Sequence, residues 1–146
     1  MNICQVNKAD YPQLLQVWEA SVRATHDFLT ETDIQYFKPL ILNTYFDAVS
    51  LCCTKDETGQ ITGFMGTADN KVEMLFIHPD TRGKGVGKAL LRHGITQLHI
   101  TEVDVNEQNE QAVGFYRHMG FQVVHRSPVD GMGKPFPILS MVLQPA

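Results

Sequence analysis

The sequence predicts an α/β (α+β) fold in which a mixed, mostly antiparallel sheet is flanked by helices on both faces. The chain has 146 residues, 43% of them hydrophobic, which suits one domain with one substantial core. Short strand-like segments joined by tight turns fill the middle of the chain and favour an antiparallel meander. The second half then alternates strand-like and helix-like segments. We therefore expect residues 1–146 to form a single domain.

The first 48 residues are expected to supply a short strand over residues 3–6 and two helices. Asp10 is a suitable helix N-cap, Pro12 is tolerated in the first turn, and Gln13 occupies the capping-box position. A second helix is expected over about residues 33–42. The apolar positions of the first helix share one face, namely Tyr11, Leu14, Leu15, Trp18 and Val22.

Turn residues separate the remaining predicted elements. Gly59 closes one tight turn, and Gly120 is a typical C-terminal stop for a helix. Strands are expected over residues 49–54, 61–67, 72–77, 99–105, 121–125 and 138–143, with helices after residue 85 and over residues 109–119.

Composition and charge argue against several classes of protein. The net charge is −4 and the pI is near 5.8, so a nucleic-acid partner, which needs a basic face, is not expected. No stretch approaches the ~20 apolar residues of a membrane span, and the N-terminus lacks the apolar stretch of a signal peptide. No H-E-x-x-H or Cys/His cluster indicates a metal. Cys4, Cys52 and Cys53 lack C-x-x-C spacing, so we expect reduced thiols in a cytoplasmic protein.

A glycine-rich turn carries the strongest chemical signal. A buried strand ends before Pro79, and the turn that follows opens a helix. Helix N-termini offer unpaired N–H groups and a positive dipole end, and glycines allow an anion to approach closely. This pattern predicts a pyrophosphate site. It is neither a P-loop nor a full G-x-G-x-x-G fingerprint, and the alternative is an ordinary glycine-rich turn. The residues concerned are Arg82, Gly83, Lys84, Gly85, Val86, Gly87 and Lys88.

Two motifs together resemble the GNAT acetyltransferase superfamily. Residues 82–87 match its R/Q-x-x-G-x-G/A signature, and residues 112–121 match its A-x-x-F/L-Y-x-x-x-G-F pattern, with Asn109 seven residues before Tyr116. The two motifs occur in the family's order and the resemblance covers essentially the full chain, which implies the GNAT-type mixed sheet. Residues 25–29, 105–116 and 133–137 look like the bacterial YjaB-type acetyltransferases, a group regarded as peptidyl-lysine N-acetyltransferases.

The resemblance implies acetyl-CoA as the cosubstrate, without a metal. The backbone of Leu75, Phe76 and Ile77 would then pair with the pantetheine arm, while residues 82–88 hold the pyrophosphate. Asn109 would hydrogen-bond the cofactor arm, cap a helix, or do both. Tyr116 would act as general acid toward the leaving thiolate of coenzyme A; the alternative is an aromatic core position.

The general base and the acceptor pocket are less well defined by the sequence. Glu73, Asp104, His26 and a water molecule are all candidates for the base. Trp18, His26 and Phe28 are candidates to line the acceptor pocket, although Trp18 is also an ordinary core residue. The loop over residues 130–137 could form the other wall.

The predicted function is N-acetyl transfer to a primary amine, and the resemblance favours a protein lysine. The alternatives are a small-molecule amine acceptor, a non-catalytic acyl-CoA-binding sensor, and a nucleotide-binding interaction module. Acyl-chain preference and oligomeric state, monomer or homodimer, are not determined by the sequence.

Overall fold

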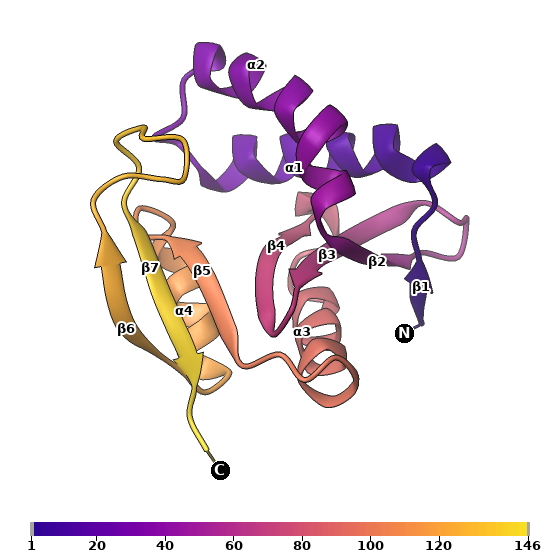
Figure 1. Cartoon of the computed structure of the whole chain (residues 1–146). Helices are drawn as coiled ribbons and strands as arrows, with labels where there is room; N and C mark the ends of the chain where they lie inside the picture. Colours follow the sequence, from indigo (N-terminus) through magenta and orange to yellow (C-terminus); the bar gives the residue numbers. More distant parts are fainter. Residues whose placement is uncertain (1, 146) are drawn as a thin grey trace.

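The computed structural model describes residues 2–145, and its main feature is a seven-stranded sheet within that range (Figure 1). The strands are β1 (Ile3–Gln5), β2 (Ser50–Lys55), β3 (Ile61–Ala68), β4 (Lys71–Ile77), β5 (Glu102–Asn106), β6 (Phe121–Ser127) and β7 (Ile138–Leu143). The α-helices in the same range are α1 (Tyr11–Thr25), α2 (Glu31–Leu40), α3 (Val86–Gln97) and α4 (Glu110–His118).

The order of the strands confirms a mixed, mostly antiparallel sheet. The order is β1-β2-β3-β4-β5-β7-β6, and each neighbouring pair is antiparallel except β4 and β5, which are parallel. These two strands pair at only two positions, Lys71 with Glu102 and Val72 with Val103. Beyond that short seam they diverge, as Figure 1 shows. The sheet is therefore divided into a β1–β4 part and a β5–β7 part.

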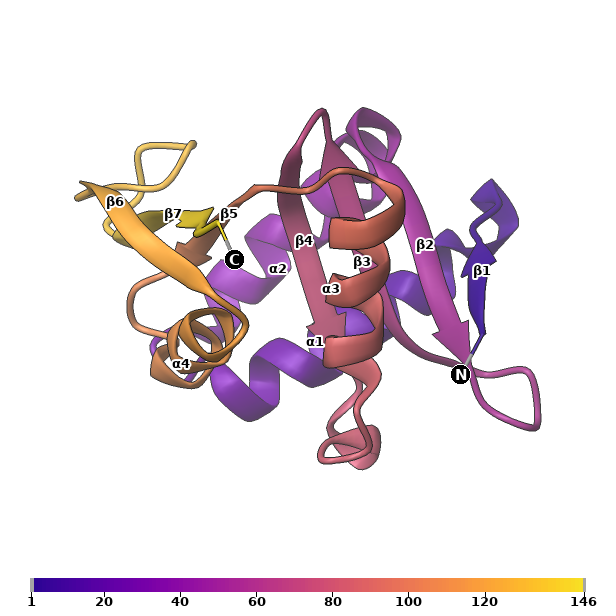
Figure 2. The same cartoon turned by 90° about the horizontal axis from the view of Figure 1, so that it is seen from below.

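Helices cover both faces of the sheet, as predicted. Phe64 and Met65 are adjacent residues of β3, both fully buried, and they belong to two different cores. Phe64 packs with residues of α1 and α2, whereas Met65 packs with residues of α3 and α4. Figure 2 shows α3 over the β1–β4 part of the sheet and α4 beside the β5–β7 part. Trp18 belongs to the core under α1, where it is 5% exposed.

The first helix begins where the sequence predicts, but its cap differs. Asp10 is the N-cap residue of α1, yet its side chain makes no capping bond to that helix. It accepts a hydrogen bond from the backbone N–H of Asn7 at 2.9 Å and so stabilises the preceding 3₁₀ turn, Lys8–Asp10. The prediction that Asp10 caps α1 through its side chain is therefore wrong, because the nearer turn uses that carboxylate.

The second helix begins earlier than predicted, because a capping box fixes its start. The hydroxyl of Thr30 accepts from the N–H of Asp33, and the carboxylate of Asp33 accepts from the N–H of Thr30. The helix therefore starts at residue 31 and not at residue 33. After Pro39 it continues into a π-helical turn, Ile41–Tyr45, and a 3₁₀ turn, Phe46–Ala48.

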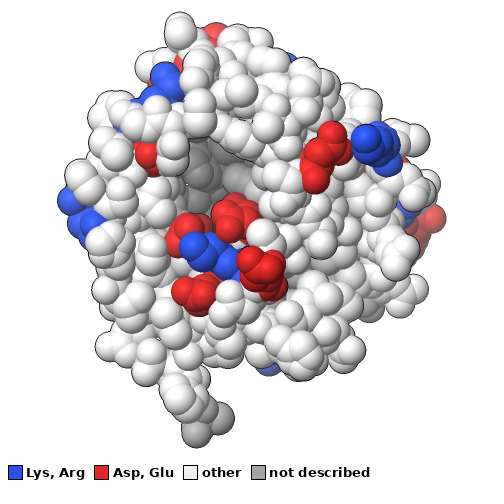
Figure 3. Space-filling view, in the orientation of Figure 1, with Lys and Arg blue, Asp and Glu red and all other residues white. Residues whose placement is uncertain are grey.

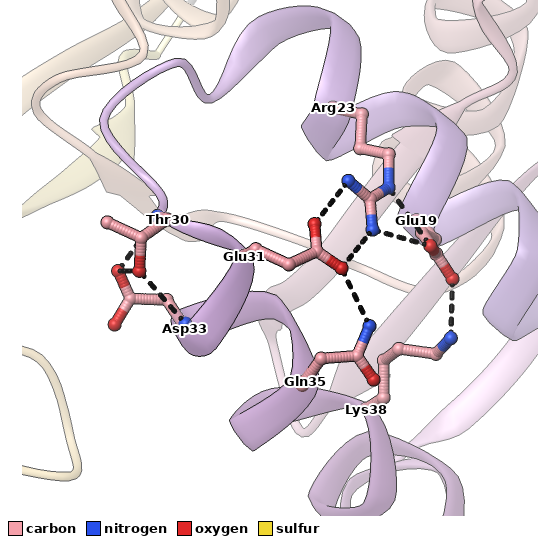
Figure 4. Close-up of polar contacts among 7 residues, drawn as sticks. All are labelled: Glu19, Arg23, Thr30, Glu31, Asp33, Gln35 and Lys38. Atoms are coloured by element: carbon pink, nitrogen blue, oxygen red, sulfur yellow. Dashed lines mark hydrogen bonds and ion pairs between the residues drawn. The ribbon is translucent and has the colours of Figure 1, made fainter.

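Charged side chains join α1 to α2 (Figure 4). Arg23 donates to Glu19 on its own helix and to both carboxylate oxygens of Glu31 on α2. Lys38 on α2 reaches back to Glu19 at 2.7 Å. These pairs are accessible to water, which weakens each of them. They link two helices whose apolar residues share one core.

In the second half of the chain, one strand begins later than predicted. The strand expected over residues 99–105 begins at residue 102, because His99 has φ of 57° in the left-handed region, where a continuing strand is excluded. Helix α4 ends before Gly120, whose φ of 100° fits the predicted stop. No helix in the described part of the chain is long and apolar enough to cross a membrane.

Candidate active site

The candidate site is a cavity of about 470 Å³ at the place where β4 and β5 diverge. Its walls come from the end of α1, from β4, from the turn before α3, from β5 and from α4. Figure 3 shows a hollow on the face that Figure 1 presents. The cavity brings together the two sequence motifs, which lie about thirty residues apart in the chain. The predicted site residues that line it are Leu75, Phe76, Ile77, Arg82, Gly83, Gly85, Val86, Gly87, Lys88, Asn109 and Tyr116.

The β4 wall has a backbone edge without a strand partner. Residues 74–77 pair with β3 on one side, but β5 pairs only with Lys71 and Val72 on the other. The β3–β4 ladder also contains a bulge, since Met74 faces Gly66 and Val72 faces Thr67. Glu73 is the extra residue of this bulge and lines the cavity. Bulges redirect side chains and are common near active sites.

The glycine-rich turn has the backbone conformation that its sequence predicts. Gly83 and Gly85 have φ of 76° and 80°, in the left-handed region that other residues enter only at a cost. Gly85 is the N-cap of α3, and no side chain caps that helix end. The first N–H groups of α3 are therefore left for another acceptor. Arg82 and Lys88 line the cavity beside them, whereas Lys84 does not.

A polar residue of the cavity wall caps the N-terminus of helix α4. Asn109 is the N-cap residue, and its Oδ1 accepts a hydrogen bond from the N–H of Ala112 at 3.2 Å. The capping bond uses only Oδ1, so the Nδ2 of Asn109, which also lines the cavity, does not take part in it.

Tyr116 follows Asn109 by about two helical turns, lines the same cavity and is 5% exposed. Burial raises the pKa of this phenol above its ordinary value, so the hydroxyl keeps its proton at neutral pH. No hydrogen bond ties that hydroxyl to another residue within 2–145.

The two acidic residues of the cavity have different surroundings. The carboxylate of Asp104 accepts from Lys71 Nζ at 3.1 Å and from Ser140 Oγ at 2.9 Å. Glu73 has no such partner in the described chain. Loss of water around its carboxyl raises the pKa of Glu73, and Lys71 opposes that change while Asp104 adds to it. Of the two, Glu73 is therefore the carboxylate better able to take up a proton.

His26 lies at the end of α1 and also lines the cavity. Its Nδ1 is 2.7 Å from the hydroxyl of Thr25, and its ring lies 5.2 Å from that of Phe28 and 6.4 Å from that of Phe76. Burial, with a smaller effect from the positive charge of Arg82, lowers the pKa of His26 to about 4. The imidazole is therefore neutral at pH 7 and is a weak base.

The other residues predicted near the acceptor lie behind the cavity wall. Trp18 and Phe28 are not among the lining residues. The loop over residues 130–137 reaches this region through Phe136, whose ring is 5.8 Å from that of Phe28. These residues support the wall by packing and do not form its surface.

Sequence reasoning missed Asn106, the last residue of β5. Its Oδ1 is fully buried, lines the cavity region and has no hydrogen-bond partner among residues 2–145. A buried acceptor without a partner is costly, so this oxygen is a candidate to accept a hydrogen bond from a bound ligand. A polar residue at the end of a strand was the signal in the sequence, but only the divergence of β4 and β5 reveals its position in the cavity.

Comparison with known proteins shows the family to which the chain belongs. The family model described as an acetyltransferase (GNAT) domain matches residues 24–141. The chain therefore belongs to the GNAT acetyltransferase family and is an acetyltransferase, as its two motifs predicted. This family uses acetyl-CoA as its acetyl donor.

Individual proteins of this family show how similar the chain is to its relatives in sequence and in structure. A peptidyl-lysine N-acetyltransferase, YjaB, of Salmonella typhimurium is 39% identical over 142 residues, 97% of each chain. The solution structure of apo-form YjaB from Escherichia coli has a TM-score of 0.91 at 38% identity, covering 99% of this chain and 98% of that one. A PaiA N-acetyltransferase from Thermoplasma acidophilum, solved with coenzyme A, has a TM-score of 0.70 at 21% identity, covering 95% and 96%, and shares the fold.

The residues present fit acetyl-CoA. The glycine turn, Arg82 and Lys88 suit a pyrophosphate, and the free edge of β4 suits the amides of a pantetheine arm. The unpartnered Oδ1 of Asn106 suits an amide N–H.

Proposed function

We propose that this protein transfers the acetyl group of acetyl-CoA to a primary amine, and that the amine belongs to a protein lysine. The observation that carries this proposal is the cavity between β4 and β5. It gathers the anion-binding turn, the unpaired strand edge and Tyr116 on connected walls. A sensor needs the first two features, but only an enzyme needs a phenol at the same place.

The chain holds the cofactor at three places in this proposal. The N-terminus of α3 and the flanking Arg82 and Lys88 bind the pyrophosphate. Backbone groups of residues 75–77 pair with the pantetheine arm as a neighbouring strand would, and one N–H faces the thioester carbonyl oxygen. Asn109 and Asn106 hydrogen-bond the arm from the opposite wall. Fixing the remote end of the cofactor orients its reacting end.

Tyr116 is the proposed general acid. Bound acetyl-CoA supplies an activated acetyl group on sulfur, and transfer forms a C–N bond while the C–S bond breaks. The Tyr116 hydroxyl donates its proton to the leaving sulfur. The raised pKa of Tyr116 keeps the phenol protonated until that moment, and the apolar surroundings favour a directed donor.

Glu73 is the proposed base. An ammonium must lose a proton before it can attack, and the carboxylate of Glu73 accepts it directly or through water. Asp104 is occupied by Lys71 and Ser140. His26, with a pKa of about 4, holds a proton too weakly. The raised pKa of Glu73 moves this carboxyl toward the working pH.

The acidic rim of the cavity supports a cationic acceptor. Glu73 and Asp104 line the cavity. The hydrogen bond with Asp104, with smaller effects from Glu73 and Glu102, raises the pKa of Lys71. Figure 3 shows acidic side chains gathered around a basic one beside the hollow. Such a rim attracts an ammonium group. The lysine itself is proposed from the relative named a peptidyl-lysine N-acetyltransferase. The free thiols of Cys4, Cys52 and Cys53 support the proposal of a cytoplasmic location.

The test follows thiol release from acetyl-CoA with lysine peptides, free amino acids and polyamines as acceptors. We expect the highest kcat/KM with a lysine peptide. For Tyr116→Phe we expect kcat to fall by roughly 10²-fold or more, the size typical of a lost general acid, with little change in acetyl-CoA affinity.

Tyr36→Phe is the matched control, because Tyr36 is 41% exposed on α2 and does not line the cavity. A higher kcat/KM with a small amine than with lysine peptides would show that the acceptor is a small molecule and not a protein lysine. Acetyl-CoA binding without thiol release for any amine would favour a sensor and refute the catalytic proposal.

A further inference from the structure

A lysine of this chain lies at the acidic rim of the active-site cavity. Glu73 and Asp104, the carboxylates of that rim, both line the cavity. Lys71 is the first residue of β4, and its Nζ lies 3.1 Å from Oδ2 of Asp104 on β5. Figure 3 shows a basic side chain among acidic ones beside the hollow. The rim that would attract the ammonium of an acceptor therefore already binds an ammonium of the protein itself.

The position of Lys71 in β4 brings its amine close to the proposed base. The seam between β4 and β5 ends at Val72, and the cavity lies where the two strands diverge beyond it. Lys71 precedes Glu73 by two residues, which is roughly 7 Å of strand. The side chain of Lys71 is 33% exposed, and the flexible four-carbon stem of a lysine can turn its amine from Asp104 toward Glu73.

The contact with Asp104 holds Lys71 only weakly. Both side chains are accessible to water, and ion pairs of this kind contribute little to stability. Asp104 also accepts a hydrogen bond from the hydroxyl of Ser140 at 2.9 Å. Asp104 therefore keeps a donor when the ammonium of Lys71 moves away, so this movement has a small cost.

The other lysines that could be compared with Lys71 differ in position. Lys38 also binds a carboxylate, that of Glu19 at 2.7 Å, and its side chain is 30% exposed, but neither residue lines the cavity (Figure 4). Lys88 lines the cavity beside the glycine-rich turn, where the pyrophosphate is proposed to bind. Lys71 is thus the lysine that lies at the end of the cavity where a proton would be exchanged.

We propose that Lys71 is itself an acetyl acceptor, so that each molecule transfers one acetyl group from its own bound acetyl-CoA to Lys71 Nζ when no other amine occupies the rim. The inference rests on the proposed function, because it uses the same cofactor, base and acid. It adds a self-modification site to an enzyme that acts on other amines.

The chemistry of this step balances with the groups already placed in the cavity. Glu73 takes a proton from the ammonium of Lys71, and the neutral amine forms the C–N bond as the C–S bond of the thioester breaks. Tyr116 gives its proton to the leaving sulfur. The nitrogen loses two protons in all, of which one restores Tyr116 and the other passes to water. The products are an amide on Lys71 and coenzyme A as the free thiol.

Self-acetylation would change the charge of the rim and then stop. Before the reaction, one ammonium faces the two carboxylates of Glu73 and Asp104, and afterwards none does. The rim is then more negative and attracts a cationic acceptor more strongly. Because an amide nitrogen does not attack a second thioester, each chain is modified at Lys71 only once.

The full-length protein incubated with acetyl-CoA, without any added amine, tests the proposal. Peptide mass spectrometry over time measures acetylation of each lysine, and release of coenzyme A is followed in parallel. We expect Lys71 to approach one acetyl group per chain. In Tyr116→Phe we expect the rate at Lys71 to fall by roughly 10²-fold, as for a lost general acid.

Lys38 is the matched control within the same molecule, because it shares the ion pair and the exposure of Lys71 but lies outside the cavity. Its slow uncatalysed acetylation should be equal in the wild type and in Tyr116→Phe. Lys71→Arg should abolish the release of coenzyme A in the absence of an amine, whereas Lys38→Arg should leave that release unchanged. Melting temperatures show whether each variant keeps its fold.

Transfer within one molecule has its own signature. The rate constant for acetylation of Lys71 should not depend on the protein concentration. Isotopically labelled Tyr116→Phe mixed with unlabelled wild type should stay unmodified at Lys71, because the wild type acetylates only itself. A labelled chain that becomes acetylated at the wild-type rate would overturn transfer within the molecule.

The remaining outcomes separate the inference from the proposed function. Equal rates at Lys71 and Lys38, or a rate at Lys71 that Tyr116→Phe does not change, would overturn the inference, because the reaction would then be uncatalysed. Transfer to a lysine peptide while Lys71 stays unmodified would also overturn it and leave the proposed function intact. If neither Lys71 nor any added amine is acetylated, both proposals are refuted.

Discussion

The two ends of the cavity differ in charge and in how that charge is held. At the rim of the sheet, Glu73 and Asp104 lie near Lys71, and side chains supply the polarity. At the helix end, the N–H groups of α3 supply part of it, and Arg82 and Lys88 supply the rest. Backbone charge cannot titrate, whereas a carboxylate can. In the proposed function, the difference means that one end holds an anion and the other exchanges a proton.

The largest effect is expected where the proton is exchanged. Glu73→Gln removes the proposed base and should lower kcat at neutral pH by roughly 10²-fold, with acetyl-CoA affinity almost unchanged. Because the pKa of Glu73 is raised, wild-type kcat/KM should fall as the pH decreases through a value above the ordinary ~4.3 of a glutamate. Steady-state kinetics across the pH range measure both effects.

Asp104→Asn is the control for this comparison. It removes an accessible ion pair with Lys71 and should change kcat by less than roughly 5-fold, in line with the small free energy of such pairs. A larger loss for Asp104→Asn than for Glu73→Gln would exchange the roles of the two carboxylates.

The next effect concerns His26, which also lines the cavity. Its pKa is lowered to about 4 in the folded protein, against about 6.5 when unfolded. The unfolded chain therefore binds more protons below pH 6.5, and the stability that neutral His26 gives is lost as the pH falls from about 6.5 to about 4. Allowing for screening by water, the loss is on the order of 2 kcal/mol.

Urea unfolding of the wild type and of His26→Gln at pH 7 and pH 4.5 measures this loss. The variant should lack that part of the pH dependence. The same dependence in both proteins would show that other groups cause it.

The smallest effect is expected for a substitution in the glycine-rich turn before α3, which tests the backbone conformation of the proposed anion site. Gly85→Ala places a Cβ at φ of 80°, which should cost about 1 kcal/mol of unfolding free energy and weaken acetyl-CoA binding. Gly114→Ala is the opposite control, because Gly114 lies inside α4 with open space around it. It should stabilise the protein by about 0.5–1 kcal/mol. Thermal or urea unfolding distinguishes the two, and a stabilised Gly85→Ala would contradict the conformational role of this glycine.

Local features of this protein could be predicted from nearby residues and the mixed sheet from the family resemblance, but the side-chain contacts of the site could not. The turn at Gly83 and Gly85, the N-cap Asn109 and the stop at Gly120 each depend on residues nearby in the chain, and the structure has all of them. Asp10 shows the limit of even local rules, since two adjacent turns competed for one carboxylate.

The features that distinguish the candidate bases depend on distant residues. The bulge at Glu73 is defined by its register with β3, and the pairing of Asp104 requires Lys71 and Ser140 from two other strands.

The two-residue seam between β4 and β5 has a thermodynamic consequence. Amide groups beyond the seam find no partner in the sheet itself, so the native state keeps a row of hydrogen bonds unmade. In the proposed function, a ligand lying along that row would act as the missing strand and join the two parts of the sheet. Affinity for the cofactor and protection of the β4 and β5 amides from solvent exchange are then two measures of the same equilibrium.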